Sequence, residues 1–206
     1  MSNGVRKKYT PVQYGAPSMG DIHDQAGNIS KHIIAANVLS YPGWDVAFPE
    51  APSSHVDMIA YNLEHCYKIQ IKSVCMEETP GGYTRVRVPL RNARKYTYTK
   101  EGDFKGRSMC YRYFENGIDC VAVFIKASNK VLRSYGLDTK VLWVWKSDVP
   151  SDLTVLHIGL NQSTGRRPSR CKANECYGFE LTRQRHEKRM EAEHGTSNSN
   201  GELSVA

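Results

Sequence analysis

The chain has 206 residues, of which 40% are hydrophobic and 24% are charged, with a net charge of +7 and an isoelectric point near 9.1. This composition is typical of a folded globular domain, and without an apolar run near 18 residues it excludes a membrane-spanning protein. No charged segment followed by an apolar one opens the chain, so we expect a cytosol-like compartment. The basic balance favours a polyanionic partner such as nucleic acid, although surplus surface lysine gives the same charge.

The first predicted elements are a flexible arm and a helix. Residues 1–20 lack hydrophobic periodicity and contain several basic residues, which predicts a flexible basic arm. Asn28 or Ser30 can cap a helix that runs to about Tyr41. The dipeptide that follows, Pro42-Gly43, ends it.

Strands dominate the middle of the chain. Apolar runs bounded by turn residues predict strands over residues 44–48, 56–61, 67–73, 83–88, 118–127, 131–135 and 141–145. The second and third of these are separated by a short polar turn and are predicted to pair as a hairpin. The run 118–127 contains six consecutive apolar residues, 120–125, which predicts a central buried strand.

The last elements lie in a polar stretch. A short strand over 177–181 and a charged helix over 182–190 are predicted, and residues 191–206 have the polar, low-complexity composition of a disordered tail. Together the elements predict one α/β domain over residues 21–190, with a mixed β-sheet flanked by helices.

Six cysteines occur, at positions 66, 75, 110, 120, 171 and 176. Cys66 and Cys120 fall in predicted apolar strands and are expected to act as small core residues. Cys171 and Cys176 are five residues apart without a second pair at zinc-site spacing, which leaves a zinc site as a minor alternative.

The predicted hairpin carries side chains that suit phosphodiester hydrolysis. Gln70 and Lys72 are two residues apart on one strand and therefore share a face, and Asp57 opens the preceding strand. The carboxylate of Asp57, the amide oxygen of Gln70 and the backbone carbonyl of Ile71 are ligands of the kind that Mg²⁺ prefers, and Lys72 would orient water or stabilise charge. Taken alone, this spacing also fits polar residues on the solvent face of an ordinary strand.

Two segments concentrate positive charge. Residues 85–107 contain eight basic residues against two acids, and residues 166–189 contain eight against three. Basic residues interleaved with tyrosines can follow a phosphate backbone, although an exposed loop of ordinary function has the same composition. The residues predicted to contact DNA are Arg85, Arg87, Arg91, Arg94, Lys95, Arg166 and Arg167.

Other chemistries lack their motifs. The sequence contains no phosphate-binding glycine loop, no dinucleotide-binding glycine fingerprint, no serine nucleophile elbow and no paired-histidine zinc motif.

Residues 27 to about 147 resemble the PD-(D/E)xK nuclease superfamily in its Gln-x-Lys branch, which includes a group I intron homing endonuclease and Holliday-junction-resolvase-like nucleases. The stretches that carry the resemblance are 27–31, 43–46, 49, 56–59, 68–73, 86–88 and 117–123. It implies a restriction-endonuclease-like core, a DNA endonuclease activity that uses Mg²⁺ or Mn²⁺, Asp57 and Gln70 as metal ligands, and Lys72 as the catalytic lysine. Because cutting both strands needs two sites, we expect a homodimer or a higher symmetric oligomer in the cytoplasm of a bacterial or phage-infected cell.

One position departs from the family pattern. The family usually has a glutamate in the early helix where this sequence has Lys31. Two like unit charges 4 Å apart repel by about 4 kcal/mol at an effective dielectric near 20, and a dication roughly doubles that. Lys31 therefore points to solvent, or the site binds metal weakly, or metal binding has been lost. Glu50 is a candidate substitute carboxylate, and an ordinary loop acid is the alternative for it.

Three functions follow from these observations. The first is a Mg²⁺-dependent DNA endonuclease. The second is a nuclease-fold protein that binds DNA but no longer cleaves it because of Lys31. The third is an interaction protein of a phage or mobile element whose basic surface meets an acidic partner.

Overall fold

The computed structural model describes residues 19–50, 56–94, 109–150, 152–160 and 171–198. The helices within these ranges are α1 (Met19–Leu39), α2 (Asn129–Ser134) and α3 (Phe179–Asn198), with 3₁₀ turns η1 (Phe114–Asn116), η2 (Lys146–Asp148) and η3 (Ala173–Cys176). The strands are β1 (Asp45–Ala47), β2 (Met58–Tyr61), β3 (Cys66–Val74), β4 (Met76–Glu78), β5 (Thr84–Pro89), β6 (Arg91–Arg94), β7 (Met109–Arg112), β8 (Cys120–Ile125), β9 (Val141–Trp145), β10 (Val155–Gly159) and β11 (Cys171–Lys172). No helix in the described part of the chain is long and apolar enough to cross a membrane.

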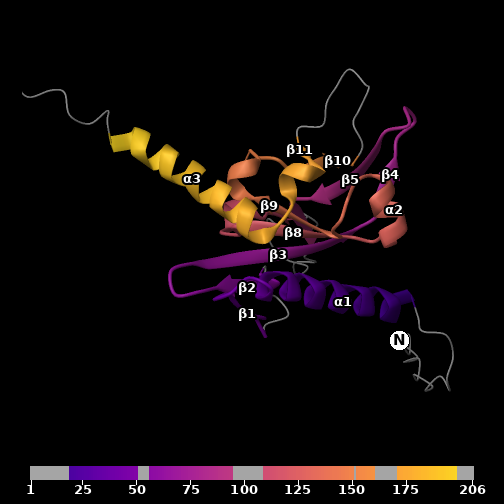
Figure 1. Cartoon of the computed structure of the whole chain (residues 1–206), viewed down its shortest axis with the longest axis horizontal. Helices are drawn as coiled ribbons and strands as arrows, with labels where there is room; N and C mark the ends of the chain where they lie inside the picture. Colours follow the sequence, from indigo (N-terminus) through magenta and orange to yellow (C-terminus); the bar gives the residue numbers. More distant parts are fainter. Residues whose placement is uncertain (1–18, 51–55, 95–108, 151, 161–170, 199–206) are drawn as a thin grey trace, which may run out of the picture.

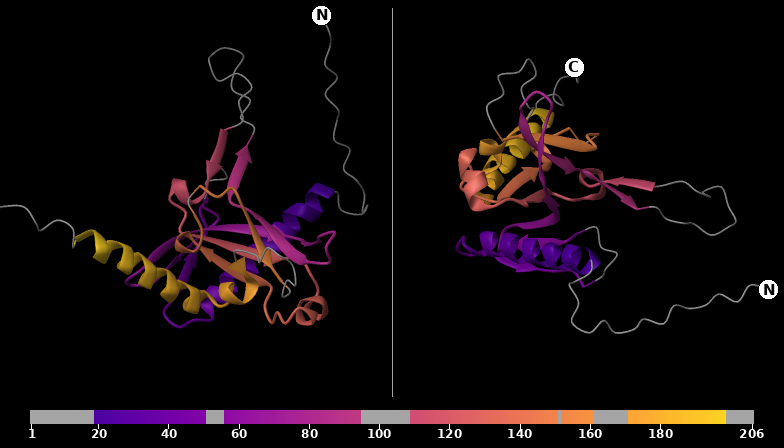
Figure 2. Two further views of the ribbon diagram at one scale, coloured as in Figure 1. Left: turned by 90° about the horizontal axis from the view of Figure 1, so that it is seen from above. Right: turned by 90° about the vertical axis from the view of Figure 1, so that its right-hand side faces the viewer.

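The strands build two sheets and a ribbon. Within the described residues, the main sheet has five strands in the order β1-β2-β3-β8-β9, and the second sheet has four in the order β11-β10-β5-β4. The main sheet is mixed, because β3 and β8 run parallel while its other neighbouring strands run antiparallel. Strands β6 and β7 form a separate antiparallel ribbon that projects from the body (Figure 2). The predicted α/β fold with a mixed sheet flanked by helices is confirmed.

The molecule is layered around the main sheet. Helix α1 lies on one side of β3, and β5 of the second sheet lies on the other (Figures 1 and 2). Strand β3 continues past Val74 directly into β4, so one stretch of chain runs from the main sheet into the second sheet. This passage brings the polar end of β3 to the junction of the two sheets.

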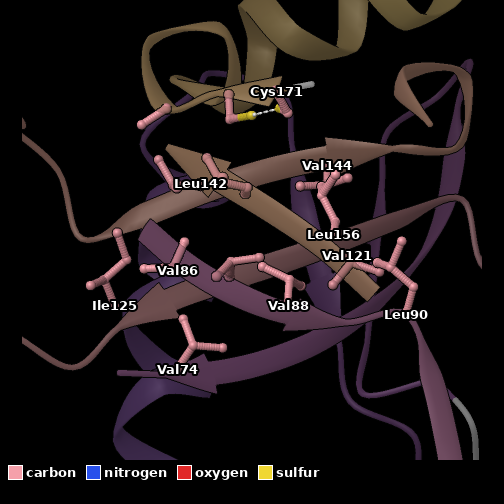
Figure 3. Packing of buried hydrophobic residues seen from close by; sticks show 14 of the residues in the cluster. Val74, Val86, Val88, Leu90, Val121, Ile125, Leu142, Val144, Leu156 and Cys171 are labelled. Atoms are coloured by element: carbon pink, nitrogen blue, oxygen red, sulfur yellow. Dashed lines mark hydrogen bonds between the residues drawn. The ribbon is translucent and has the colours of Figure 1, made fainter. Parts of the chain in front are cut away.

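The core between the two sheets is aliphatic. Alternate residues of β8, namely Val121, Val123 and Ile125, belong to this cluster with Val86 and Val88 of β5. Figure 3 shows Val121 and Ile125 among these packed side chains. The alternation follows from the period of two along a strand, which directs every second side chain to the same face. Burial of this apolar surface is the main force that holds the sheets together.

The core on the α1 side of the main sheet is aromatic. Phe179, at the start of α3, is fully buried and meets Trp44 edge-on with ring centroids 4.9 Å apart. It also lies 5.0 Å from Trp143 and 5.9 Å from Trp145. Ile34 of α1 belongs to the same cluster. One phenylalanine therefore joins the last helix to the sheet that α1 covers.

Several predicted elements are confirmed with shifted ends. The 62–65 turn joins β2 and β3 as an antiparallel hairpin, and β8 is a fully buried central strand paired with β9. Helix α1 begins at Met19, ahead of the predicted caps, and includes the last two residues of the predicted arm; residues 1–18 lie outside the described residues. Helix α3 extends to Asn198, past the predicted start of the tail.

Two predicted strands are wrong. Residues 131–135 form most of helix α2, because Ser128 caps it by accepting a hydrogen bond from the Val131 backbone N–H at 3.3 Å. The predicted strand over 177–181 contains the start of α3 instead, because Gly178, with φ of 70°, turns the chain before Phe179 enters the aromatic cluster. In both places tertiary packing overrides a short apolar pattern that fits a helix equally well.

One cysteine prediction is also wrong. Cys120 is buried as expected, but Cys66 is exposed at the start of β3. Because side chains alternate along a strand, Cys66 lies on the same face as Lys68, and the buried Tyr67 and Ile69 lie on the other.

Candidate functional site

Asp57 lies beside β3 at the point where β2 begins. The β2–β3 hairpin pairs Met58 with Ile69, and the Asp57 backbone N–H donates to the Ile69 carbonyl at 3.0 Å. The Asn62 side chain fixes this register by accepting hydrogen bonds from two backbone N–H groups of the hairpin turn. Residue 57 is therefore the cross-strand neighbour of Gln70, and the two side chains share a face.

The carboxylate of Asp57 makes direct contact with β3. Its Oδ2 accepts a hydrogen bond from Nε2 of Gln70 and another from the backbone N–H of Ile71 at 2.8 Å. The N–H and C=O of one strand residue point to the same side of the strand, so the carbonyl of Ile71 also faces the Asp57 side. The structure thus brings together the three oxygen-bearing groups that the sequence singled out.

Lys72 follows on the same face as Gln70, two residues along β3. Its Nζ lies 4.8 Å above the ring centre of Tyr113, which is only 2% exposed. A cation over an aromatic face is attracted by the ring quadrupole, and a buried ring is a rigid support. Tyr113 therefore helps to fix the direction of the ammonium group.

Lys31 reaches the site from α1. Its Nζ is 3.9 Å from Oδ1 of Asp57, and the two side chains are 40% and 23% exposed. The helix is held here by the fully buried Ser30, whose hydroxyl accepts a hydrogen bond from Ser73 Oγ at 2.9 Å. Ser30 in turn donates to the carbonyl of Gly27 at 2.7 Å. Among the sequence alternatives for Lys31, the one that points it away from Asp57 is therefore wrong.

These contacts give the site an unusual charge. Lys31 and Lys72 carry two positive charges and Asp57 one negative charge, so the three groups sum to +1. A site with this sum attracts an anion such as a phosphodiester more readily than a dication.

Other metal ligands are scarce in the described part of the chain. Glu50 is exposed in the segment after β1 and, within the described residues, forms no ion pair. No group of three or more His, Cys, Asp or Glu side chains gathers among the described residues. Any ion at this site would depend on Asp57, amide and backbone oxygens, and oxygens from a substrate.

Some of the residues predicted to contact DNA lie among the described residues, and others lie outside them. Arg87 and Arg91 are exposed, and Arg85 forms an ion pair with Glu77 at 3.4 Å. Arg94 is the last residue of β6. The remaining predicted contacts lie outside the described residues: Lys95, Arg166 and Arg167.

A groove lies next to the site. It has a volume of about 460 Å³ and is lined by Ser73, Val74, Cys75, Glu77, Arg87, Pro89, Arg91 and Val155. Ser73 directly follows Lys72, so the groove begins where the polar groups of β3 end. We call this surface the arginine groove.

Cys171 and Cys176 are close neighbours in a separate place. Their sulfur atoms are 3.2 Å apart, and both thiols are buried. The hydrogen bond between them lowers the pKa of the Cys171 thiol and raises that of Cys176. Among the described residues, no further His, Cys, Asp or Glu side chain gathers with them to complete a zinc site.

The sequence assigns no role at the site to Ser30 or Ser73, and it suggests Tyr113 only as one of several tyrosines interleaved with basic residues. Tyr113 belongs to a basic, tyrosine-containing segment whose path the sequence did not reveal. Ser30 and Ser73 lie within stretches that carried the family resemblance, and each directly precedes or follows a lysine of the site. Their buried hydroxyl pair had no sequence signal beyond that adjacency.

Comparisons with known proteins give a likeness in structure. No family model matches the chain, and no curated protein matches it. Among solved structures, a bacterial homing endonuclease is similar with a TM-score of 0.49 and 16% sequence identity, over 71% of this chain and 84% of that one. A likeness of this extent establishes neither the fold nor the function of this chain.

Proposed function

We propose that this chain is a Mg²⁺-dependent DNA endonuclease of the PD-(D/E)xK type. The observation that carries the proposal is the contact between Asp57 of the β2 end and Gln70 of β3, with Lys72 on the same face and the arginine groove beside it. A carboxylate, an amide and an ammonium converging next to a basic groove suit hydrolysis of a phosphodiester.

The oxygens at the site suit a single Mg²⁺. Asp57, the carbonyl of Ile71 and, after a half-turn of its amide group, Gln70 would hold the ion, and Glu50 is a further candidate ligand. Hard oxygen ligands of this kind, together with water and substrate phosphate, are what Mg²⁺ requires. When bound, the ion supplies positive charge that stabilises the anionic transition state of phosphodiester hydrolysis.

The chain's own residues supply positioning and charge. Lys72, held over Tyr113, points an ammonium group toward the charge that develops on the phosphate, or orients the attacking water. The backbone N–H of Ile71 and the amide of Gln70 fix the orientation of the Asp57 carboxylate. The Ile71 N–H keeps this orientation when Gln70 turns its amide oxygen toward the ion, so the carboxylate itself needs little reorganisation.

DNA is the proposed substrate because the groove presents exposed arginines next to the site. Arg87 and Arg91 would contact phosphates on either side of the cleaved bond, which fixes register without reading sequence. One chain carries one such site, so a double-strand break would require two copies of the chain.

Plasmid nicking tests the proposal directly. The wild-type chain is expected to convert supercoiled plasmid to the nicked form with Mg²⁺ or Mn²⁺ and to lose this activity when the ion is chelated. Lys72→Ala is expected to lower the nicking rate by about 10²- to 10³-fold, the range for removal of one transition-state donor. Nicking that survives both chelation and Lys72→Ala would contradict the proposal.

A second candidate function is DNA binding without cleavage. The ion pair between Lys31 and Asp57 favours it, because the lysine already neutralises the carboxylate that would hold a metal. A wild-type chain that retains plasmid at low salt but leaves it intact with both ions would support this second function over the first.

The arginine groove gives a separate prediction about affinity. Arg87→Ala is expected to weaken duplex binding at low salt and to reduce the slope of log affinity against log salt by about 1, because about one counterion is released per phosphate contact. Fluorescence anisotropy between 50 and 200 mM salt, roughly the range over which phosphate contacts weaken, measures both. Arg133→Ala, at an exposed position of α2, is the matched control and is expected to leave the slope unchanged. An unchanged slope for Arg87→Ala would remove the groove from the DNA path.

A further inference from the structure

The carboxylate of Asp57 is already neutralised within the protein. Oδ2 accepts two hydrogen bonds from β3, and Oδ1 faces the ammonium group of Lys31. A divalent ion that approaches Oδ1 meets a like charge at 3.9 Å from that oxygen. The ion and the ammonium group therefore compete for the same side of one carboxylate.

We propose that the ammonium group of Lys31 occupies the place of a divalent ion at Asp57 in the free protein. When DNA binds, this ammonium group moves to a DNA phosphate, and only then does a divalent ion bind tightly. The inference rests on the proposed function, since it concerns the same site and the same substrate. Lys31 is then the residue that couples metal binding to DNA binding.

The geometry allows the side chain to move while the backbone stays fixed. The Nζ to Oδ1 distance of 3.9 Å is at the outer limit of an ion pair, and the Lys31 side chain is 40% exposed. The hydrogen bond between Ser30 and Ser73 holds the adjacent backbone of α1 to β3. A flexible four-carbon stem on a fixed backbone can exchange one anionic partner for another nearby.

The net charge of Lys31, Lys72 and Asp57 explains why a phosphate binds before a divalent ion. With Lys31 and Lys72 present the three charged groups sum to +1, which attracts a phosphodiester before a dication. Once the phosphate has paired with Lys31, Oδ1 is released and phosphate oxygens become available as ligands. By linkage, the factor by which DNA raises metal affinity equals the factor by which the metal raises DNA affinity.

Calorimetric titration of Mg²⁺ tests the inference. The full-length chain carries Lys72→Ala in every sample, which keeps a short duplex intact during the titration. The background protein is expected to bind Mg²⁺ at least tenfold more tightly with the duplex than without it. Adding Lys31→Met is expected to raise the duplex-free affinity at least tenfold and to reduce the enhancement by the duplex by about the same factor, although phosphate oxygens still serve as ligands.

Matched variants separate the charge of Lys31 from other effects. Lys188→Met, which removes an exposed helical lysine from α3, is expected to leave the tenfold coupling in place. Lys31→Gln removes the same charge as Lys31→Met with a polar side chain and is expected to reproduce its effect. Thermal unfolding of each variant shows that the fold is retained, and if one Lys31 variant fails to fold the other decides the result.

The outcomes distinguish this inference from the proposed function. Unchanged duplex-free Mg²⁺ affinity in the folded Lys31 variants overturns the inference, even if the wild-type chain nicks plasmid. An enhancement by the duplex that is not reduced after removal of Lys31 also overturns it. If the wild-type chain does not nick plasmid and no variant binds Mg²⁺ with or without the duplex, both the inference and the proposed endonuclease function fail.

Discussion

Asp57→Asn is expected to abolish cleavage while leaving DNA binding intact or stronger. Asparagine has the same size and can still accept the hydrogen bond from the Ile71 backbone N–H, but it carries no charge for an ion. The sum of the charged groups rises from +1 to +2, which favours phosphate. We expect the nicking rate to fall by about 10³-fold, equivalent to about 4 kcal/mol of transition-state stabilisation.

Two measurements on the same protein check this separation. Plasmid nicking with Mg²⁺ measures cleavage, and anisotropy with a labelled duplex in the absence of the ion measures binding. Asp152→Asn, at an exposed position outside the site, controls for the general change in net charge and is expected to cleave at the wild-type rate. Parallel losses of cleavage and binding in Asp57→Asn would show that the carboxylate has a structural role instead.

Among the variants described, Phe179→Ala is expected to lower the free energy of unfolding most. The ring is fully buried and meets Trp44 and Trp143 at centroid distances of 4.9 and 5.0 Å. Removing a buried phenylalanine leaves a cavity that surrounding rings fill only in part, and such changes lower the free energy of unfolding by about 3–5 kcal/mol. Urea unfolding followed by tryptophan fluorescence measures the change, because the neighbouring rings report it directly.

A nearby leucine provides the control for this prediction. Leu181 lies on the same first turns of α3 but is 70% exposed. Leu181→Ala is therefore expected to change the free energy of unfolding by less than about 0.5 kcal/mol. Comparable losses in the two variants would mean that α3 as a whole, and not the aromatic cluster, determines stability.

The contact of Asp57 with Gln70 and the position of Lys72 on the same face could be predicted because they depend on local rules. A four-residue turn between two strands fixes the hairpin register, and the period of two then places Gln70 and Lys72 on one face. Both rules act over a few residues and need no knowledge of the rest of the fold. The buried character of β8 was predictable for a similar reason, since consecutive apolar residues rich in valine are typical of a strand covered on both faces.

The direction of Lys31 could not be predicted because it depends on where a helix sits. A helix rotates its side chains by about 100° per residue, so the facing of one residue follows from packing contacts far away in sequence. Here the decisive contact is the hydroxyl pair of Ser30 and Ser73, which are 43 positions apart. The second sheet was missed likewise, because β10 pairs with β5 across a long stretch of chain and its strands are short.

Strand β3 of the main sheet runs on into β4 of the second sheet, and this has a consequence for how the chain can vary. Insertion or deletion of a single residue between Ile69 and Lys72 would turn the later side chains of the strand to the opposite face, moving Lys72 away from Asp57 and altering the wall of the groove in one step. A point substitution in this segment changes one side chain, whereas a change in its length moves every side chain that follows in the strand. Related sequences are therefore expected to keep the length of this segment even where they differ from this chain at positions 57, 70 and 72.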